Sequence, residues 1–550
     1  MKKTIASFSL FAFLLTVLPL TSLAGPTSIR VTPPAPKFAD AERHAELARR
    51  RAAVAAKMAD KSILVMFSAE PKLYTNDVDY VYRQENNLYY LTGLKQDGAT
   101  FVMTKDGGTV TETLFLPKRV PVREAWEGKM YSREQAMNVS GVKNLIDASE
   151  RDAFLEALKA RRAFTAANGG GAISSVPDTV YLLLPEAEQD TNGHREFRVE
   201  NELSKTLAGV KVENAQFIFS ELRHIKSPYE LKLLQHAIDI TTEAQMRSMA
   251  TIGRLSWEYE VHAEVEYTFR RRNADFWGYP SIVGCGPNAT TLHYVESQGE
   301  VKKGDLMLMD VGAEYDHYTA DVTRTFPANG KFSKEQAEIY QIVFDAQEAA
   351  AKATKPGATM QQVSAAADNV IREGLFKLGL TTDNTSNQFK RWYIHGLGHW
   401  LGMNVHDVGR YGVPLKAGMV FTNEPGIYIR EDTLDNLADT PENRAFIEKV
   451  RPAFEKYKNI GVRIEDDMLV TEGGVEWMTK HLPRTIADIE AFMAAAPKQV
   501  SLSTRFTQPP VNLFFDQSTA SFSTLFMLDD TNRTGGHTHR SGFIHLHGEG

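Results

Sequence analysis

Two aspartates, Asp310 and Asp321, lie in a segment, 308–322, whose composition is typical of a β-hairpin. A hairpin loop centred between Tyr315 and Asp316 would place the two aspartates directly opposite each other, with their Cβ atoms about 5 Å apart. Two like charges in this position destabilise a sheet unless something neutralises them. A bound cation would do so. The alternative is that one or both carboxylates point to solvent.

A second segment, 395–407, contains His395, His399 and His406, with glycines between them. The glycines predict a shaped loop rather than a regular helix. A single histidine is more often a core or surface residue than a ligand, but three histidines in twelve positions favour a functional site.

Two further acids, Glu424 and Glu465, lie in strand-like segments that are otherwise largely apolar. An isolated acid in a strand usually faces water. Here two such acids accompany two aspartates and a histidine-rich loop within one predicted domain. A metal site is the explanation that covers all of these residues together.

The first half of the chain alternates helical and strand-like segments. Helices are predicted over 40–59 and 149–162, and short apolar runs lie at 63–67, 88–91, 100–103, 113–116 and 180–184. This alternation predicts an α/β domain over 38–220.

A domain boundary is predicted near residue 221. Ser227, Pro228 and Glu230 form a helix-start signal, and Ser333 with Gln336 forms a second one. Strand-like runs lie at 306–310, 419–423 and 462–470. We therefore expect an α+β domain over 221–497.

The chain begins with two lysines, an apolar run and a small-residue exit at Ala24, an order typical of a secretory signal peptide over 1–24. The apolar run is too short for a membrane span, so we expect export to the periplasm or the extracellular space and no stable membrane anchor. A proline-rich linker is predicted over 25–37, and a low-complexity tail over 498–550. The tail ends in histidines and glycines, but it is assigned no function.

Composition narrows the classes of function further. The formal net charge of −7 gives no basic surface for nucleic acid, so no nucleic-acid partner is expected. Cys285 is the single cysteine, which excludes an intrachain disulfide, and its glycine-rich surroundings favour a small loop residue over a nucleophile.

The sequence resembles the aminopeptidase P and prolidase family of pita-bread metallopeptidases. The likeness rests on the hairpin and the histidine loop described above, on the Asn-Glu-Pro-Gly and Val-Arg-Ile-Glu-Asp-Asp motifs, and on 279–284 and 292–294. The N-terminal domain is more weakly similar to that of creatinase and aminopeptidase P, mainly through 83–93. The fold implied is a pita-bread α+β catalytic domain preceded by a smaller α/β creatinase-like domain.

The resemblance also implies roles for individual residues. It places metal ligands at Asp310, Asp321, His399, Glu424 and Glu465, and it places His293, His395, His406, Tyr428 and Arg463 around the scissile bond and the proline of the substrate. One departure is His317, where relatives often carry glycine, and a left-handed conformation there would cost about 1–2 kcal/mol.

This ligand set is rich in oxygen and suits two divalent ions, with Mn²⁺ preferred and Zn²⁺, Co²⁺ or Fe²⁺ also accommodated. The implied reaction is hydrolysis of an N-terminal Xaa-Pro peptide bond by a hydroxide that bridges the two ions, with Glu424 relaying a proton and His395 and His406 stabilising the oxyanion. The substrates would be peptides with proline at the second position, and the resemblance implies a homo-oligomer.

Three alternatives stand beside the Xaa-Pro aminopeptidase. Prolidase, an Xaa-Pro dipeptidase, shares every ligand. Creatinase shares the fold without metal, but the intact ligands argue against it. A non-catalytic peptide-binding protein on this fold would be expected to have lost ligands that are all present here.

Overall fold

A computed structural model describes residues 28–167, 170–185 and 197–496 of the chain. The predicted signal peptide, 1–24, and the predicted tail, 498–550, lie outside these residues. Within the described ranges, no helix combines the length and apolar character needed to cross a membrane.

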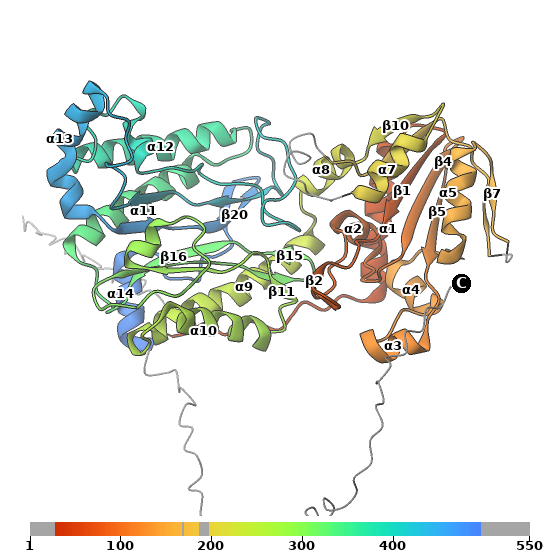
Figure 1. Ribbon diagram of the computed structural model, residues 1–550, viewed down its shortest axis with the longest axis horizontal. Helices are drawn as coiled ribbons and strands as arrows, with labels where there is room; N and C mark the ends of the chain where they lie inside the picture. Colours follow the sequence, from red (N-terminus) through yellow and green to blue (C-terminus); the bar gives the residue numbers. More distant parts are fainter. Residues whose placement is uncertain (1–27, 168–169, 186–196, 497–550) are drawn as a thin grey trace, which may run out of the picture. The chain divides into compact units, whose positions relative to one another are not determined.

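The N-terminal domain is built on a six-stranded mixed sheet with the strand order β10-β9-β1-β4-β5-β6 (Figure 1). β1 pairs antiparallel with β4 and parallel with β9, while β5 pairs antiparallel with β4 and parallel with β6. The strands are β1 (Ser62–Phe67), β4 (Thr100–Asp106), β5 (Thr109–Leu116), β6 (Asn144–Asp147), β9 (Thr179–Leu182) and β10 (Lys211–Asn214). Short pairs are formed by β2 (Leu73–Thr75) with β3 (Val78–Asp79) and by β7 (Phe164–Thr165) with β8 (Ala172–Ile173).

Helices connect these strands, as the predicted α/β alternation requires. They are α1 (Asp40–Lys57), α2 (Asn86–Thr92), α3 (Pro121–Glu127), α4 (Arg133–Ser140), α5 (Arg151–Lys159), α7 (Arg198–Thr206) and α8 (Gln216–His224).

The strand-like interpretation of the apolar run 88–91 is wrong, because this run lies in α2. The side chain of Glu85 accepts hydrogen bonds from the first backbone amides of the helix, and Gly93 ends it with a left-handed φ of 65°.

The C-terminal domain has two layers of paired helices with strands between them (Figure 1). The first pair is α9 (Pro228–Thr251) and α10 (Glu258–Arg271), and the second is α11 (Lys334–Ala353) and α12 (Met360–Lys377). The main sheets have the orders β12-β13-β16 and β17-β20-β21, and smaller ones are β11-β14-β15 and β18-β19. α13 (Pro441–Tyr457) and α14 (Ile486–Ala495) complete the domain.

The strands of this domain are short. They are β11 (Phe276–Trp277), β12 (Ile282–Cys285), β13 (Leu306–Val311), β14 (Ala313–Tyr315), β15 (Tyr318–Thr319), β16 (Val322–Pro327), β17 (Val420–Asn423), β18 (Gly426–Ile429), β19 (Ile460–Arg463), β20 (Asp466–Thr471) and β21 (Gly474–Trp477).

Both predicted helix-start signals are confirmed. The Ser227 side chain accepts from the Glu230 amide, and the Glu230 carboxylate accepts from the Ser227 amide; the two bonds together cap α9. Ser333 and Gln336 form the same reciprocal pair at the start of α11.

The hairpin that carries the two aspartates has a different register from the predicted one. Asp310 on β13 pairs with Thr323 on β16, so Asp321 is not directly opposite Asp310. The turn is centred between Asp316 and His317, and both residues have left-handed backbones, with φ of 49° and 70°. The register differs by two residues, which preserves the pleat and leaves both aspartates on one face of the hairpin.

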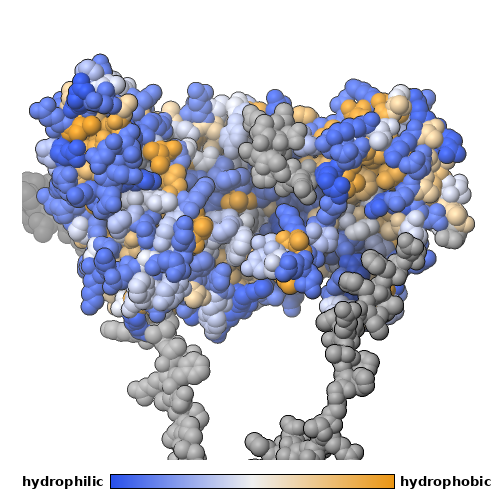
Figure 2. All heavy atoms as spheres, viewed as in Figure 1, coloured by the Kyte–Doolittle hydropathy of each residue, from blue (hydrophilic) through white to orange (hydrophobic). Residues whose placement is uncertain are grey.

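The predicted single strand over 462–470 is in fact two strands in different sheets. β19 pairs with β18 and β20 pairs with β17, and Glu465 lies in the step between them. On the face shown in Figure 2, hydrophilic residues predominate and apolar side chains appear in small separate groups, because most large apolar side chains lie in the core.

Candidate metal centre

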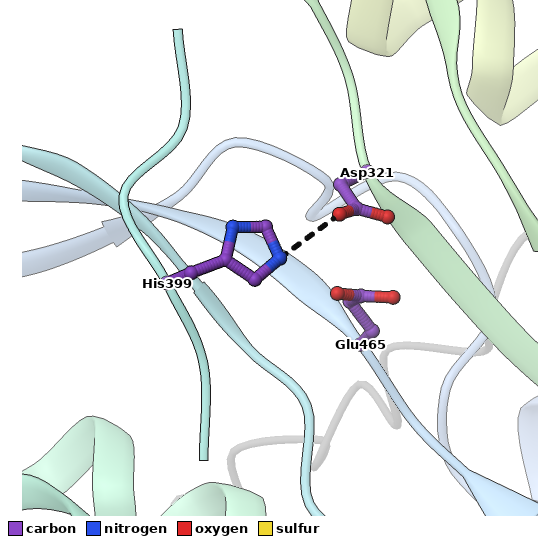
Figure 3. A group of neighbouring side chains, drawn as sticks. All are labelled: Asp321, His399 and Glu465. Atoms are coloured by element: carbon purple, nitrogen blue, oxygen red, sulfur yellow. Dashed lines mark ion pairs between the residues drawn. The ribbon is translucent and has the colours of Figure 1, made fainter. Parts of the chain in front are cut away.

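Three of the predicted ligands, Asp321, His399 and Glu465, come together in the C-terminal domain. Each offers one ligand atom, and these atoms all lie within 4.8 Å of one another. The imidazole points toward both carboxylates, and His399 Nε2 is 3.2 Å from Asp321 Oδ2 (Figure 3). The spacing is that of a group able to share one cation.

Asp310 joins this group through a residue to which no role was assigned from the sequence. The hydroxyl of Tyr279 lies 2.5 Å from Asp310 Oδ1 and 2.6 Å from Asp321 Oδ1. A phenol has a single proton to donate, so it can satisfy only one of the two carboxylates at a time. The repulsion between the two aspartates is therefore reduced but not removed.

Arg463 supplies the fixed positive charge at the other side of Asp310. Its Nη2 donates to Asp310 Oδ2 at 2.6 Å, and its Nη1 donates to the Tyr428 hydroxyl at 2.7 Å. Burial alone would raise the pKa of Asp310, but the charge of Arg463 together with the hydrogen bonds from Tyr279 and Arg463 outweighs burial and holds this pKa below its ordinary value.

Glu424 closes the group on the side of the histidine loop. Its Oε1 is 3.4 Å from His399 Nε2 and accepts from the Thr422 hydroxyl at 2.9 Å. Burial and the neighbouring charge of Asp321 raise the pKa of Glu424 to about 7, although the charge of His399 opposes the shift. A carboxyl with such a pKa can accept and release a proton near neutral pH.

The backbone around His399 runs beside β17 as an additional extended segment. The Thr422 amide donates to the His399 carbonyl at 2.9 Å, and the Glu424 amide donates to the Leu397 carbonyl at 2.9 Å. A Cβ on Gly398 would lie 1.8 Å from the Thr422 carbonyl oxygen, so this close approach requires glycine. The predicted shaped loop is confirmed.

The electrostatics of the group favour bound cations. Burial and the charge of Asp310 raise the pKa of Asp321, and burial and neighbouring carboxylates raise that of Glu465 strongly. Within the described part of the chain, Arg463 is the one guanidinium that donates to a carboxylate of the group. Four carboxylates and one imidazole fit divalent ions that prefer oxygen ligands.

His395 is held by protein groups on both ring nitrogens. The Tyr428 hydroxyl accepts a hydrogen bond from Arg463, so its own proton is directed to His395 Nε2 at 2.8 Å, and His395 Nδ1 donates to the Gly396 carbonyl at 2.7 Å. Burial and the charge of Arg463 lower the pKa of His395 to about 3. The imidazole is therefore neutral at physiological pH.

His406 lies beside the group, next to the ring of His399. The rings of His399 and His406 are 4.3 Å apart, and His406 makes no hydrogen bond to another described side chain. Burial and the charges of His399 and His293 lower its pKa to about 4. His293 is exposed to solvent.

Besides Thr422, two side chains that contact the predicted ligands were not identified from the sequence. Tyr279 lies in the segment 279–284, one of the motifs that resemble the family, but nothing in its type or spacing indicated a contact with two aspartates. Thr323 donates its hydroxyl to Glu465 at 2.6 Å and accepts from Arg463 Nε at 3.2 Å. The correct hairpin register, which places Thr323 opposite Asp310, was needed to find it.

Comparison with known proteins accounts for both domains. The model of metallopeptidase family M24 matches residues 232–472, and that of the aminopeptidase P N-terminal domain matches residues 47–165. A Haemophilus influenzae Xaa-Pro aminopeptidase is 36% identical over 460 residues, covering 82% of this chain and 97% of the relative. An Escherichia coli Xaa-Pro aminopeptidase is 34% identical over 467 residues, covering 82% and 98%.

Comparison with solved structures leads to the same family. Escherichia coli aminopeptidase P with the inhibitor Pro-Leu is similar with a TM-score of 0.71 at 32% identity, covering 84% of this chain and 100% of that one. The fold and site thus define a two-domain M24 metallopeptidase with a pita-bread catalytic domain. The chain belongs to the aminopeptidase P family, and this membership implies bound divalent metal ions.

Proposed function

We propose that this protein is an Xaa-Pro aminopeptidase that removes the residue preceding proline from the N-terminus of a peptide. The observation that carries the proposal is the single network in which all five predicted ligands meet, from Asp310 through Tyr279 to Asp321, His399, Glu424 and Glu465. The relatives named Xaa-Pro aminopeptidases, which match over 97% and 98% of their length, support this choice.

The five ligands would hold two divalent ions, and we propose Mn²⁺ as the native metal because of the oxygen-rich donor set. When bound, the ions lower the pKa of a water molecule and polarise the substrate carbonyl. A Zn-substituted Escherichia coli aminopeptidase P in complex with product is similar to this chain at a TM-score of 0.69 and 32% identity, covering 84% of this chain and 99% of that one. Zinc therefore stays an alternative.

The residues around the ligands have separate roles in the proposed reaction. Glu424, whose Oε1 lies 3.4 Å from His399 Nε2, is suited by its position to take a proton from the attacking water and pass it to the leaving proline nitrogen. His406 makes no hydrogen bond to another side chain in the described part of the chain, and it is suited to stabilise the oxyanion by donating one. His395 can donate to an oxyanion only by giving up its contact with Gly396, so we assign it to holding Tyr428 beside Arg463.

Proline explains the need for a dedicated enzyme. Its nitrogen carries no hydrogen and its ring fixes φ, which hinders the extended strand-like capture that most peptidases use. We propose that Arg463, Tyr428 and the exposed His293 lie around the proline of the substrate.

The test compares an Xaa-Pro dipeptide with the same dipeptide extended by one residue, at equal concentration and with Mn²⁺ present. We expect faster release of the first residue from the extended peptide. Negligible cleavage of the extended peptide with rapid cleavage of the dipeptide would indicate prolidase instead. Tight binding of both peptides without cleavage, in fully metal-loaded protein, would indicate a peptide-binding protein.

We also propose that the protein is exported, with a mature chain beginning near Gly25, and that it forms a homo-oligomer. Support comes from the leader-like pattern at 1–24 and from family resemblance. N-terminal sequencing of protein recovered from the cell envelope and the medium tests the first point, and recovery of chain with Met1 intact from the cytosol would contradict it. Light scattering of the mature protein tests the second.

A further inference from the structure

Asp407, the residue directly after His406, lies in a buried cluster of charges. Its Oδ1 is 2.5 Å from Arg223 Nη2, and its Oδ2 is 3.2 Å from Lys226 Nζ. The exposed fractions of these three side chains are only 1–2%. One carboxylate is thus enclosed by two cations away from water.

The cluster links the loop that carries His406 to the N-terminal half of the chain. Arg223 lies in α8 and also donates to Asn87 Oδ1 at 2.7 Å and to Asn404 Oδ1 at 2.8 Å. Asn86, in α2, donates to the same Asn404 oxygen at 2.8 Å. The segment 404–407 is therefore fixed by side chains from α2 and α8.

The loop is also closed tightly on itself. The Asp407 amide donates to the Trp400 carbonyl at 2.8 Å, and a Cβ on Gly402 would lie 2.1 Å from Asp407 Oδ2. This closure joins the residue after His399 to the residue after His406, and the ring centroids of these two histidines are 4.3 Å apart.

Stability alone does not account for such a cluster. Removing charges from water is costly, and well-packed apolar residues of similar volume often stabilise a protein as well as a buried ion pair does. The cluster gives the loop a single geometry through directional bonds, and His406 has no hydrogen bond of its own to another described residue that would fix its ring.

We propose that Asp407, held by Arg223 and Lys226, is a positioning residue for His406. Through the buried cluster of charges around Asp407, α2 and α8 set the geometry of the oxyanion-stabilising imidazole. The proposal rests on the proposed Xaa-Pro aminopeptidase function, in which His406 acts on the transition state. A misplaced imidazole should lower kcat and leave KM and metal content nearly unchanged, because neither ground-state binding nor the metal ligands are altered.

The experiment is a double-mutant cycle on the full chain loaded with Mn²⁺. Asp407→Asn is combined with Lys226→Met, which keeps the side-chain shapes and leaves one net positive charge in the cluster, as in the natural chain. This double change is made in the natural chain and in the His406→Ala background, and kcat and KM are measured on an extended Xaa-Pro peptide.

In the natural background we expect kcat to fall about 10- to 100-fold, with KM and metal content nearly unchanged. In the His406→Ala background the same change should lower kcat by less than about twofold, because its effect passes through His406. Equal losses in both backgrounds, or no loss in either, would overturn the proposal.

Two further variants keep the test decisive. Glu243→Gln breaks another ion pair, between the buried Glu243 and the partly exposed Arg272 at 2.7 Å, and should lower stability without changing kcat. If the double change prevents folding, Arg223→Lys keeps the charge but loses the fork shared by Asn87, Asn404 and Asp407, and its loss of kcat should likewise vanish in the His406→Ala background. Failure of the natural chain to cleave any Xaa-Pro peptide would instead refute the proposed function.

Discussion

The imidazole of His317 stacks on the ring of Tyr89, with ring centroids 3.8 Å apart and an interplanar angle of 15°. His317 Nδ1 also lies 3.1 Å from Asn86 Oδ1. The tip of the hairpin that carries Asp310 and Asp321 is therefore packed against α2 of the N-terminal domain. His317 keeps a left-handed backbone, with φ of 70°, even though it is not glycine.

We expect His317→Gly to destabilise the protein, although it relieves backbone strain. Relief of the left-handed conformation is worth about 1–2 kcal/mol. Loss of a buried aromatic side chain costs about 3–5 kcal/mol, so the free energy of unfolding should fall by about 2 kcal/mol. Chemical denaturation of the variant and the natural chain under matched metal conditions measures the difference.

Asn76→Gly is the matched control, because Asn76 is an exposed turn residue with φ of 47°. It changes the same kind of backbone without removing buried packing, and should be close to neutral. A gain in stability for His317→Gly larger than that for Asn76→Gly would show that the Tyr89 stack contributes little.

A second prediction concerns Glu46, which joins α1 to the start of α9. It accepts from Arg49, Arg50 and the Ser227 hydroxyl. Burial would raise the pKa of Glu46, but these hydrogen bonds and the charge of Arg50 outweigh it and lower this pKa from 4.5 to about 2. We expect Glu46→Gln to reduce the free energy of unfolding at pH 7 by about 1 kcal/mol or more.

The sign of the pH dependence follows from the depressed pKa. The contribution of Glu46 is present above the unfolded-state pKa and is lost as the pH falls from about 4.5 toward about 2. The difference in free energy of unfolding between the natural chain and Glu46→Gln should therefore become smaller when denaturation is repeated at decreasing pH below 5. Glu42→Gln, on the same helix and in an exposed pair with Lys232, should show neither the loss nor the narrowing. A gap that widens toward low pH would contradict the assignment.

The residue types at the site could be predicted from the sequence because metal chemistry requires acids and imidazoles whatever the backbone does. Asp310, Asp321 and Glu465 were identified in this way, and the helix starts at Ser227 and Ser333 followed from local capping chemistry. These features depend on short-range physics that a single segment carries.

The features that could not be predicted depend on contacts between distant segments. The hairpin register shifted by two residues because His317 and Asp316 form the turn, and packing on Tyr89 supports that turn. The apolar run that includes Leu88 is helical because Glu85 caps it, which outweighs its strand-like composition. The contact of Tyr279 with both Asp310 and Asp321 becomes apparent only when the positions of these distant segments relative to each other are known.

Tyr279→Phe should affect the metal-free protein more than the metal-loaded protein. Without metal, the phenol of Tyr279 lies between the carboxylates of Asp310 and Asp321. Its loss removes a hydrogen bond to these two buried like charges and strengthens their repulsion. We expect the free energy of unfolding of the metal-free protein to fall by about 1–3 kcal/mol. Bound cations would take over the neutralisation, so the loss should be smaller with Mn²⁺. Equal losses with and without metal would contradict this account.

The last prediction tests the ligand assignment at Glu465. This carboxylate belongs to the group within 4.8 Å and is held by the Thr323 hydroxyl, and burial together with the charges of Asp321 and Glu424 raises its pKa well above the ordinary value. Glu465→Gln keeps the shape and removes the charge. We expect the metal-free variant to be at least as stable as the natural chain, since a buried like charge is gone. We also expect it to bind less metal, measured by elemental analysis after dialysis, and to lose hydrolysis of Xaa-Pro peptides.

The control is Glu200→Gln in α7, a buried glutamate of the N-terminal domain whose pKa burial raises to about 8. It should gain stability in the same way while keeping its metal and its activity. Normal metal content and a normal rate in Glu465→Gln would show that Glu465 is not a ligand.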